Sequence, residues 1–475
     1  MIPTTVGNEA LAAQLATIVN ELSWHDVPEP VRAVAKLHVL DALGVGLAAT
    51  GMDFGHAIHR AAQRLGHGDQ AHALGFGTPL PAASAALVNG TLFHGLDFDD
   101  THIGAIYHAT APALAAALAV AEEQHACGDE LLFAYIVGLE IGCRLASAGA
   151  GEFHGRGFHP TGIAGAFAAT CTAAVLRGLD ADTLTSALGL CGSQAAGILE
   201  LHGSWLKRMH PGWAAHAGIA AATMAEAGFR GPATVFEGAG GLYNSHLGHT
   251  VTADDLGLQD LGSRWMTTGI ALKPYPCCHF THAFADAAAG VLADLGRERL
   301  TAEEVASIEC PTAPALIPMV TEPADKKIAP TTIYDALFSV QYVVATALAG
   351  RRVDLAAFYD QSLDHPDVLA LAALVTCPPD PDSDFPIHFP GETVVHLKDG
   401  RTVRRRIPAS LGTPENPLSD SDIQAKFYAN AARVLDTAQA QHIAELVDTL
   451  DKLPGTATLV ESCVIASPCN DVQPS

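Results

Sequence analysis

The chain has 475 residues, of which 49% are hydrophobic and only 16% are charged. This length exceeds one typical domain, and the composition suits a large, well-buried core. The net charge of −25 at pH 7 argues against nucleic acid and anionic membranes as partners, and an anionic substrate would have to be held by local cations.

The N-terminal stretch MIPTTVGNEALAAQLA has no basic region followed by an uninterrupted apolar one, so we do not expect a signal peptide. Apolar runs such as residues 109–121 are shorter than the ~20 residues that a membrane helix needs. The ten cysteines are scattered without CxxC pairs, which favours a reduced protein over a zinc ribbon. We therefore expect a cytoplasmic protein without a membrane partner.

Apolar, alanine-rich segments separated by Gly and Pro follow one another from about residue 8 to 270 and predict an all-helical domain. Small residues recur at helical spacing, so these helices are expected to pack closely. The clearest predicted helices are residues 30–49, 81–93, 109–123, 131–146, 162–176 and 211–227, the last with Gly228 as its C-terminal cap.

The pattern changes near Lys273. Residues 305–310 alternate like a short strand, and residues 392–397 and 402–407 flank Asp399-Gly400, which predicts a type I′ hairpin. Residues 333–349 predict a helix between these strands. This part of the chain is therefore expected to be α+β.

Helical patterning returns in residues 421–435 and 438–451. The simplest architecture is mainly α: a large helical domain (residues 1–270), interrupted by a smaller α+β lid domain (271–408), with C-terminal helices (409–475) that rejoin the first. The absence of GxGxxG and GxxxxGK[ST] sequences gives no support for a nucleotide cofactor.

The stretch HGLDFDDTH, residues 94–102, places three carboxylates and two imidazoles within nine residues. If the preceding helix continues through it, Asp97 shares a face with His94 and with Thr101. A metal site would use His94, Asp97 and either Asp100 or His102, but no HExxH motif or second carboxylate cluster completes a shell. A solvated helix end is a further alternative, and we favour a metal-free acid/base or substrate-orienting site.

Lysine is rare in this chain, and between residues 37 and 325 only Lys207 and Lys273 occur. They stand in WLKRMHPGWAAH and ALKPYPCCHFTH, beside Pro, His and aromatic residues. Either could be a lysine whose charge reaches solvent from a helix end. Two such lysines with histidines close by favour a site instead.

Histidines cluster in the same way. His154 and His159 lie in GEFHGRGFHPTG, a loop that leads into a predicted helix, and His279 and His282 follow Lys273 with the spacing of one helix face. A single histidine is more often an ordinary core or surface group, but several near helix starts favour a common function.

Six blocks of sequence together resemble the MmgE/PrpD family, which includes 2-methylcitrate dehydratase, cis-aconitate decarboxylase and iminodisuccinate epimerase. The resemblance covers roughly residues 10–450. In chain order, the blocks are HGLDFDDTH, GFHPTG, LKRMHPGWAAHAG, FEGAGGLY, LKPYPCCHFTHAFADA and TTIYDALFSVQY.

The resemblance implies a helical domain with an α+β lid, a homodimer, and chemistry on small polycarboxylates without metal or cofactor. Carried over block by block, the site of the family falls on Asp97, Thr101, His108, His159, Lys207, Lys273 and Tyr334. His102 is the alternative to His108, because the stretch THIGAIYH is one residue longer than the spacing typical of decarboxylase members.

These residue types suit a reaction that places or removes a proton next to a carboxylate. His159, Lys207 and Lys273 can supply cations or bases, and Tyr334 can donate a proton. Asp97 and Thr101 can orient the substrate, with His102, His279 and His282 as further binding residues.

The first hypothesis is a metal-free dehydratase or decarboxylase. An epimerase using the same residues as two bases is the alternative enzyme, and a non-catalytic helical binding protein is the alternative outside enzymes. The few charges on the Ala- and Gly-rich helices also predict a homodimer. Lys273 is expected on a cleft between the two domains.

Overall fold

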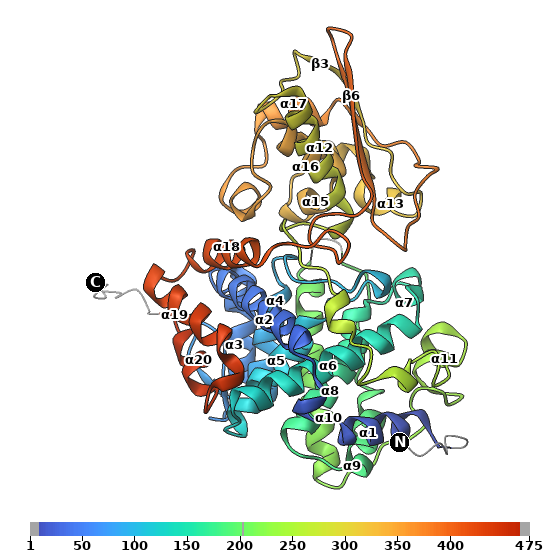
Figure 1. Ribbon diagram of the computed structural model, residues 1–475, viewed down its shortest axis with the longest axis vertical. Coiled ribbons are helices and arrows are strands. Elements are labelled where there is room, and N and C mark those ends of the chain that lie inside the picture. Colours follow the sequence, from blue (N-terminus) through green and yellow to red (C-terminus); the bar gives the residue numbers. More distant parts are fainter. Residues whose placement is uncertain (1–8, 202–203, 466–475) are drawn as a thin grey trace. The chain divides into compact units, whose positions relative to one another are not determined.

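The computed structural model describes residues 9–201 and 204–465 and divides into two compact units (Figure 1). Unit 1 comprises residues 1–270 and 419–475, and unit 2 comprises residues 271–418. The chain returns to unit 1 after Leu418 rather than after residue 408, which corrects the predicted second boundary. The reason is that residues before Leu418 bond within unit 2: Leu272 N donates to Gly412 O at 2.9 Å, and Leu411 N donates to Asp286.

Unit 1 is built from helices, apart from one short antiparallel pair, β1 (Ala71–His72) and β2 (Pro79–Leu80), in its described residues. The helices of its first segment are α1 (Leu11–Glu21), α2 (Glu29–Thr50), α3 (Asp53–Leu65), α4 (Ala82–His94), α5 (Thr110–Glu123), α6 (Gly128–Ala148), α7 (Glu152–Gly155), α8 (Pro160–Leu176), α9 (Ala181–Cys191), α10 (Leu206–Glu226) and α11 (Leu242–Leu247). The C-terminal segment adds α18 (Asp420–Ala431), α19 (Thr437–Asp448) and α20 (Ala457–Ser462).

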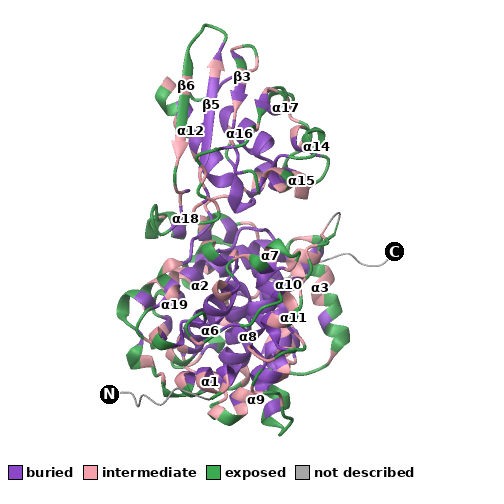
Figure 2. Ribbon diagram, turned by 90° about the vertical axis from the view of Figure 1, so that its right-hand side faces the viewer, coloured by how far each residue is buried: buried purple, intermediate pink, exposed green. Residues whose placement is uncertain are grey.

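The core of unit 1 consists of helices that are apolar on all sides. Every residue of α8 from Pro160 to Ala174 is buried, and α4, α5 and α6 are buried along almost their whole length, as the interior of this unit in Figure 2 shows. A helix without a polar face belongs inside a protein or inside a membrane. Mainly helical architecture is thereby confirmed for this part of the chain.

Two helices, α2 with 22 residues and α6 with 21, are long and apolar enough to cross a membrane by length and composition. The sequence prediction considered only shorter runs and missed them. Their most apolar windows are 78% and 83% buried inside the structure, which is what core helices show.

Helices α4 and α10 pack at a glycine contact. A Cβ on Gly90 would lie 2.7 Å from Gly212 Cα, and a Cβ on Gly212 would lie 2.2 Å from Leu87 O. Helix α10 also begins at Leu206, more than one turn before the predicted start at Pro211, which lies inside the helix. Proline has no N–H, so Pro211 cannot donate the usual helical hydrogen bond to the carbonyl of Lys207 in the first turn of α10.

Unit 2 contains a four-stranded sheet in the order β4-β3-β5-β6, with β3 and β4 parallel and the other pairs antiparallel. Its strands are β3 (Val305–Glu309), β4 (Val375–Thr376), β5 (Gly391–Leu397) and β6 (Thr402–Ile407). Its helices are α12 (His282–Leu295), α13 (Ile317–Val320), α14 (Ala324–Ile328), α15 (Ile333–Leu337), α16 (Val340–Leu348) and α17 (Pro366–Ala372). The predicted smaller α+β part is this unit.

Two local predictions in unit 2 are wrong in detail. Residues 333–349 form two helices, because Ser339 accepts a hydrogen bond from Tyr342 N and starts α16 anew. The β5–β6 turn is not type I′, since only Gly400 has a positive φ, of 93°. Gly400 N donates to Leu397 O at 3.0 Å, which makes a type I turn followed by a left-handed glycine.

The α4–α10 contact generates a prediction about stability. Gly212→Ala should lower the free energy of unfolding by about 1–3 kcal/mol, because the new methyl group has to displace backbone atoms of α4. Gly269→Ala is the matched control, since a Cβ there meets nothing within 4 Å. Urea unfolding followed by circular dichroism measures both, and equal stabilities of the two variants would contradict the prediction.

Candidate active site

Three buried histidines of unit 1 converge from three separate elements. His94 is the last residue of α4, His108 lies just before α5, and His159 is the N-cap of α8. The ring centroid of His94 lies 4.4 Å from that of His108 and 5.7 Å from that of His159, and the other two are 5.9 Å apart. We call these three residues the imidazole cluster.

The cluster depends on where α4 ends. Helix α4 stops at His94, with Gly95 as its C-cap, and Asp97 takes a positive φ of 52°. A left-handed conformation is strained for a residue other than glycine, and such strain gathers at functional sites. The helical face expected to join Asp97 and Thr101 is therefore wrong, because the chain has already left the helix.

Asp100 links the loop that follows α4 to neighbouring helices through hydrogen bonds. Its carboxylate accepts hydrogen bonds from His38 Nδ1 at 2.9 Å and from Thr110 N at 3.1 Å, and also from the Thr110 hydroxyl. His38 belongs to α2 and Thr110 begins α5, so one carboxylate links the loop to two helices.

Lys426 of α18 holds the same loop from the C-terminal segment of unit 1. Its ammonium lies 2.7 Å from Asp41, donates to Phe98 O at 2.7 Å, and sits 3.9 Å from the centroid of the Phe98 ring. The return of the chain to unit 1 thus fixes the loop that carries Asp97 and Asp99.

Asp99 binds two members of the cluster. Its Oδ2 accepts from His94 Nδ1 at 2.8 Å, and its Oδ1 lies 3.4 Å from His108 Nδ1, which also donates to Asp100 O at 2.8 Å. Burial opposes ionisation of Asp99, but the nearby His94 and His108 hold the pKa of its carboxyl well below the usual value. Burial lowers the pKa of His94 to about 4, so at neutral pH the carboxylate is charged and His94 is neutral.

His159 is paired with a further histidine of α10. His159 Nδ1 and His210 Nδ1 are 2.9 Å apart. Burial lowers the pKa of His159 well below its ordinary value and that of His210 to about 4, and the positive charge of Lys207 acts in the same direction. Both rings are then neutral at neutral pH, and one nitrogen donates its proton to the other.

Lys207 supplies the cation of the site. Its Nζ donates to Asp97 Oδ1 at 2.8 Å. Burial is the main cause of a lowered pKa at four nearby histidines, and the positive charge of Lys207 lowers the same pKa values further. These histidines are His94, His154, His159 and His210. The charge of this lysine disfavours imidazolium at several rings, as does burial. An anion bound there would offset both the repulsion between the positive charges and the cost of burying them. The arrangement is suited to binding a carboxylate.

Unit 1 brings together Asp97, His108, His159 and Lys207, four of the residues that the sequence analysis names as site candidates. Between His102 and His108, the structure places His108 in the cluster. His102 lies near Asp100 and Arg264, and burial lowers its pKa to about 4. The Thr101 hydroxyl is buried without a hydrogen-bond partner in the described part of the chain.

The remaining predicted residues lie in unit 2. Lys273 is 1% exposed. His279 Nε2 is 3.3 Å from the Ser410 hydroxyl, His282 Nε2 donates to Cys277 O at 3.1 Å, and the rings of these two histidines are 4.7 Å apart. Tyr334 stacks on Phe338 with centroids 4.5 Å apart.

The sequence analysis did not single out His210, and it named His94 within the stretch 94–102 but not among the site residues. A usable signal was present for His210, which follows Lys207 by three residues in a helix and so shares its face. The contact between His94 and His159 joins residues far apart in the chain, and local spacing carries no trace of it.

Ring nitrogens of His94, His108 and His159 lie within 4.8 Å of one another. Such a set could hold a divalent cation, with Asp99 orienting His94 as a carboxylate does in zinc sites. The sequence analysis found no residues that would complete a metal-ligand shell around His94, but the structure places His159 where it could do so. Against a metal stands the Lys207 ammonium, whose charge already acts on two of these rings.

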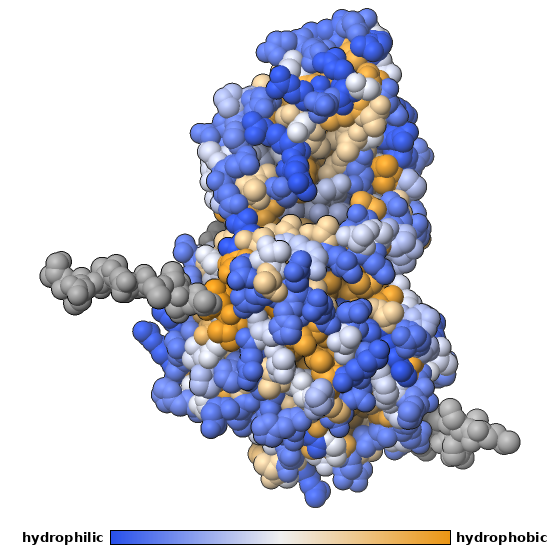
Figure 3. Space-filling model, turned by 60° about the vertical axis from the view of Figure 1, so that its left-hand side comes forward, coloured by the Kyte–Doolittle hydropathy of each residue, from blue (hydrophilic) through white to orange (hydrophobic). Residues whose placement is uncertain are grey.

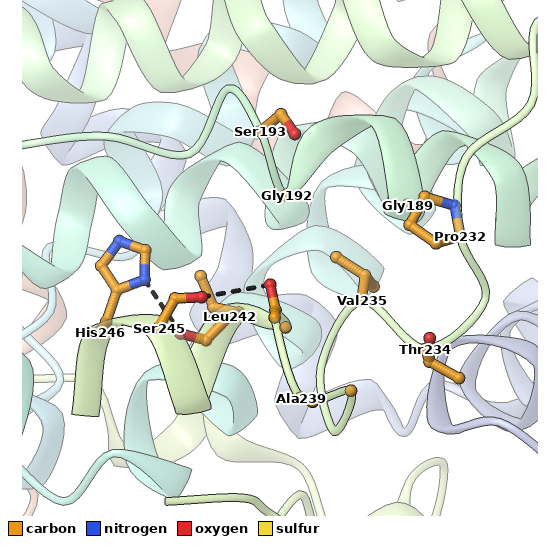
Figure 4. Close-up of a pocket in the computed structure, with 13 residues that line it drawn as sticks. Gly189, Gly192, Ser193, Pro232, Thr234, Val235, Ala239, Leu242, Ser245 and His246 are labelled. Atoms are coloured by element: carbon orange, nitrogen blue, oxygen red, sulfur yellow. Dashed lines mark hydrogen bonds between the residues drawn. The ribbon is translucent and has the colours of Figure 1, made fainter. Parts of the chain in front are cut away.

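A separate cavity of about 390 Å³ lies in unit 1 (Figure 4). It is lined by Gly189, Gly192, Ser193, Pro232, Thr234, Val235, Gly238, Ala239, Gly240, Gly241, Leu242, Ser245 and His246. The wall includes most of the FEGAGGLY block, but Ser245 and His246 already bond to backbone carbonyls. The lining contains no Asp, Glu, Lys or Arg, and we place the candidate site at the imidazole cluster.

Residues 13–253 match the model of the MmgE/PrpD N-terminal domain, and residues 275–452 match that of the MmgE/PrpD C-terminal domain. The chain belongs to the MmgE/PrpD family. The resemblance of the six sequence blocks is thereby confirmed.

Relatives of this MmgE/PrpD protein extend over nearly its whole length. It is 28% identical to a cis-aconitate decarboxylase-like protein, oryM, of Aspergillus oryzae, covering 94% of this chain and 95% of the relative. It is 27% identical to the cis-aconitate decarboxylase of Mus musculus (95% and 93% covered) and 28% identical to that of Homo sapiens (95% and 94% covered). The protein is an enzyme of the lyase type.

The anchoring of the loop by Lys426 can be tested through stability. Lys426→Met should lower the free energy of unfolding by about 3–5 kcal/mol, because Asp41 is left as a buried carboxylate without its cation. Arg297→Met is the control, since Arg297 pairs with Glu304 where the side chains are 45% and 37% exposed, and its loss should cost about 0–1 kcal/mol.

The loss in Lys426→Met should also depend on pH. Burial raises the pKa of Asp41, while Lys426 lowers it, so removing the lysine raises this pKa further above the unfolded value. A raised carboxyl pKa costs stability as the pH rises through it. Denaturant unfolding should therefore show a larger deficit at about pH 8 than at about pH 5, and a deficit that shrinks with rising pH would contradict the assignment.

Proposed function

We propose that this protein is a metal- and cofactor-independent lyase that decarboxylates or dehydrates a small di- or tricarboxylate, with cis-aconitate as the first substrate to test. The observation that carries the proposal is the buried imidazole cluster beside the Lys207–Asp97 pair. The decarboxylase names of the relatives support this substrate class.

Decarboxylation of cis-aconitate needs one proton and no redox partner. The bond between the CH₂ carbon and its carboxylate breaks, and the released electron pair forms a new C=C bond to the central carbon. The old C=C pair takes up a proton at the far carbon, which yields carbon dioxide and itaconate. The protein has to bind the remaining carboxylates and deliver that proton, which requires cations and an acid.

Lys207 supplies the cation in the proposal, and one ring of the imidazole cluster, to which His108 and His159 belong, supplies the acid. The ammonium binds a substrate carboxylate, and the anionic substrate raises the proton affinity of His159, which burial has lowered. Asp97 orients Lys207, and Thr101, His102, His279 and His282 stay candidate substrate-binding residues. Tyr334 stays a candidate proton donor.

The function is tested by incubating the purified enzyme with cis-aconitate, 2-methylcitrate, citrate and related acids, followed by mass spectrometry. Loss of carbon dioxide identifies a decarboxylase, loss of water a dehydratase, and unchanged mass with altered stereochemistry the alternative epimerase. Turnover should survive exhaustive chelation. Binding without turnover of any acid would favour a non-catalytic protein, and a stoichiometric metal lost together with activity would contradict the metal-free proposal.

Lys207→Met should lower kcat/KM at least ~100-fold on the substrate that this panel identifies, because the cation that holds a carboxylate is lost. Lys452→Met in the C-terminal segment of unit 1 is the control and should stay within about twofold of the unmodified enzyme. Steady-state kinetics on both variants check this, and near-normal kcat/KM of Lys207→Met would remove Lys207 from the site.

Lys273 gives the corresponding prediction in unit 2. Lys273→Met should keep the fold, because the aliphatic stem stays, while turnover falls at least ~100-fold, as for the loss of a positioned acid/base or charge-stabilising group. Lys326→Met, an exposed lysine of α14, should change turnover little. Normal turnover of Lys273→Met with an unchanged circular dichroism spectrum would make Lys273 a structural residue.

We also propose that the enzyme works as a homodimer in the cytoplasm. Large apolar side chains stay exposed on α10, with Trp205 just before it at 50% and Trp213 within it at 38%. Apolar patches interrupt the polar surface of unit 1 on the face drawn in Figure 3. Exposed apolar area of this kind is commonly covered by a second subunit.

A further inference from the structure

His94 is a titratable group that the proposed roles above leave unused. It is 1% exposed, and its Nε2 atom is buried without a hydrogen-bond partner among residues 9–201 and 204–465. A buried polar atom without a partner costs free energy. The rings of His108 and His159 flank it, so this atom belongs to the imidazole cluster.

The tautomer of His94 follows from its partner. An ionised carboxylate accepts hydrogen bonds and cannot donate them, so His94 must carry its proton on Nδ1 to bond Asp99 Oδ2. The neutral ring then has a lone pair on Nε2. His108 is fixed in the same way, because its Nδ1 donates to the carbonyl of Asp100.

We propose that His94 is a catalytic acid/base of this enzyme and that Asp99 is its positioning residue. The inference rests on the lyase function proposed above. Asp99 is to His94 what the carboxylate of a catalytic triad is to its histidine: it holds the ring in one tautomer and stabilises the imidazolium that forms.

The proton balance is simple. An anionic substrate in the cluster favours protonation of His94 at Nε2, and Asp99 stays ionised. The Nε2 proton then passes to the substrate carbon as carbon dioxide leaves, and the ring returns to its neutral Nδ1–H form. One proton is consumed in each turnover and is regained from water.

The test compares two variants of the full chain. In His94→Asn, the amide N–H takes the place of Nδ1 and can still bond Asp99, while nothing replaces Nε2. Its kcat should fall at least ~100-fold with KM within about threefold. His216→Asn is the control: His216 lies on α10, is partly buried, and bonds Ala83 O through Nδ1 at 3.0 Å. It should keep kcat within about twofold.

Two further measurements distinguish chemistry from structure. His94→Gly should recover at least ~10-fold in kcat with added imidazole but not with the much less basic pyrazole, because only a base of suitable strength replaces the ring. Asp99→Asn should lower kcat at least ~10-fold, since it stabilises the imidazolium less. If His94→Asn keeps kcat within threefold of the unmodified enzyme, or if pyrazole restores His94→Gly as well as imidazole does, the inference is overturned.

A measurement on the unmodified enzyme covers the case in which these variants fail to fold. In ¹⁵N-histidine spectra, His94 should carry its proton on Nδ1 in the free protein and gain one on Nε2 when the unreactive tricarballylate binds. A neutral Nε2–H form in the free protein would overturn the inference. If the unmodified enzyme turns over no polycarboxylate, the proposed function fails, while the spectra still report on the tautomer of His94.

Discussion

Three buried carboxylates near the end of α4 each need a positively charged or hydrogen-bonding partner, and these partners come from several helices of unit 1. Asp41, Asp99 and Asp100 are each 2% exposed or less, and a charge placed in such surroundings costs several kcal/mol unless it is paired. Each carboxylate has a partner from another element: Lys426, His94 and His38, respectively. These pairs tie the loop after α4 to the helices around it, and the loop in turn positions the candidate site.

The hydrogen bond between Asp99 and His94 also determines which nitrogen of His94 carries the proton. Because Asp99 stays charged, the histidine that it binds is held in one tautomer, and because burial disfavours imidazolium, that ring is neutral at neutral pH. Lys207 adds a cation whose charge is shared with Asp97. This local cation is the basis on which we propose a polycarboxylate ligand, even though the protein carries a net charge of −25.

Close packing makes the arrangement possible. Core helices rich in Ala and Gly approach one another closely, as at Gly90 and Gly212, and this brings the start of α10 next to the end of α4. Lys207 and His210 are delivered to the imidazole cluster by that contact. The small residues of these helices therefore help to position the candidate site.

The sequence by itself determined the helical class, most helix positions, the α+β insertion and the family. Apolar periodicity and the order of six short blocks are properties of the sequence itself and can be recognised without the tertiary structure. It also indicated Asp97, His108, His159 and Lys207 as site residues. It failed where a single side chain or backbone angle decides the outcome, as with Ser339 splitting a predicted helix and Gly400 alone adopting a positive φ.

Only the tertiary structure decided which histidines meet and in which form. The position of His108 in the cluster, the pairing of His159 with His210 and the contact of His94 with His159 depend on residues tens of positions apart. Burial lowers the pKa of His94, His159 and His210, and burial is a property of the packed unit rather than of the residue. Proton-transfer chemistry depends on both contact and burial, and for that reason the sequence could indicate the residues of the site while the fold determined what each of them can do.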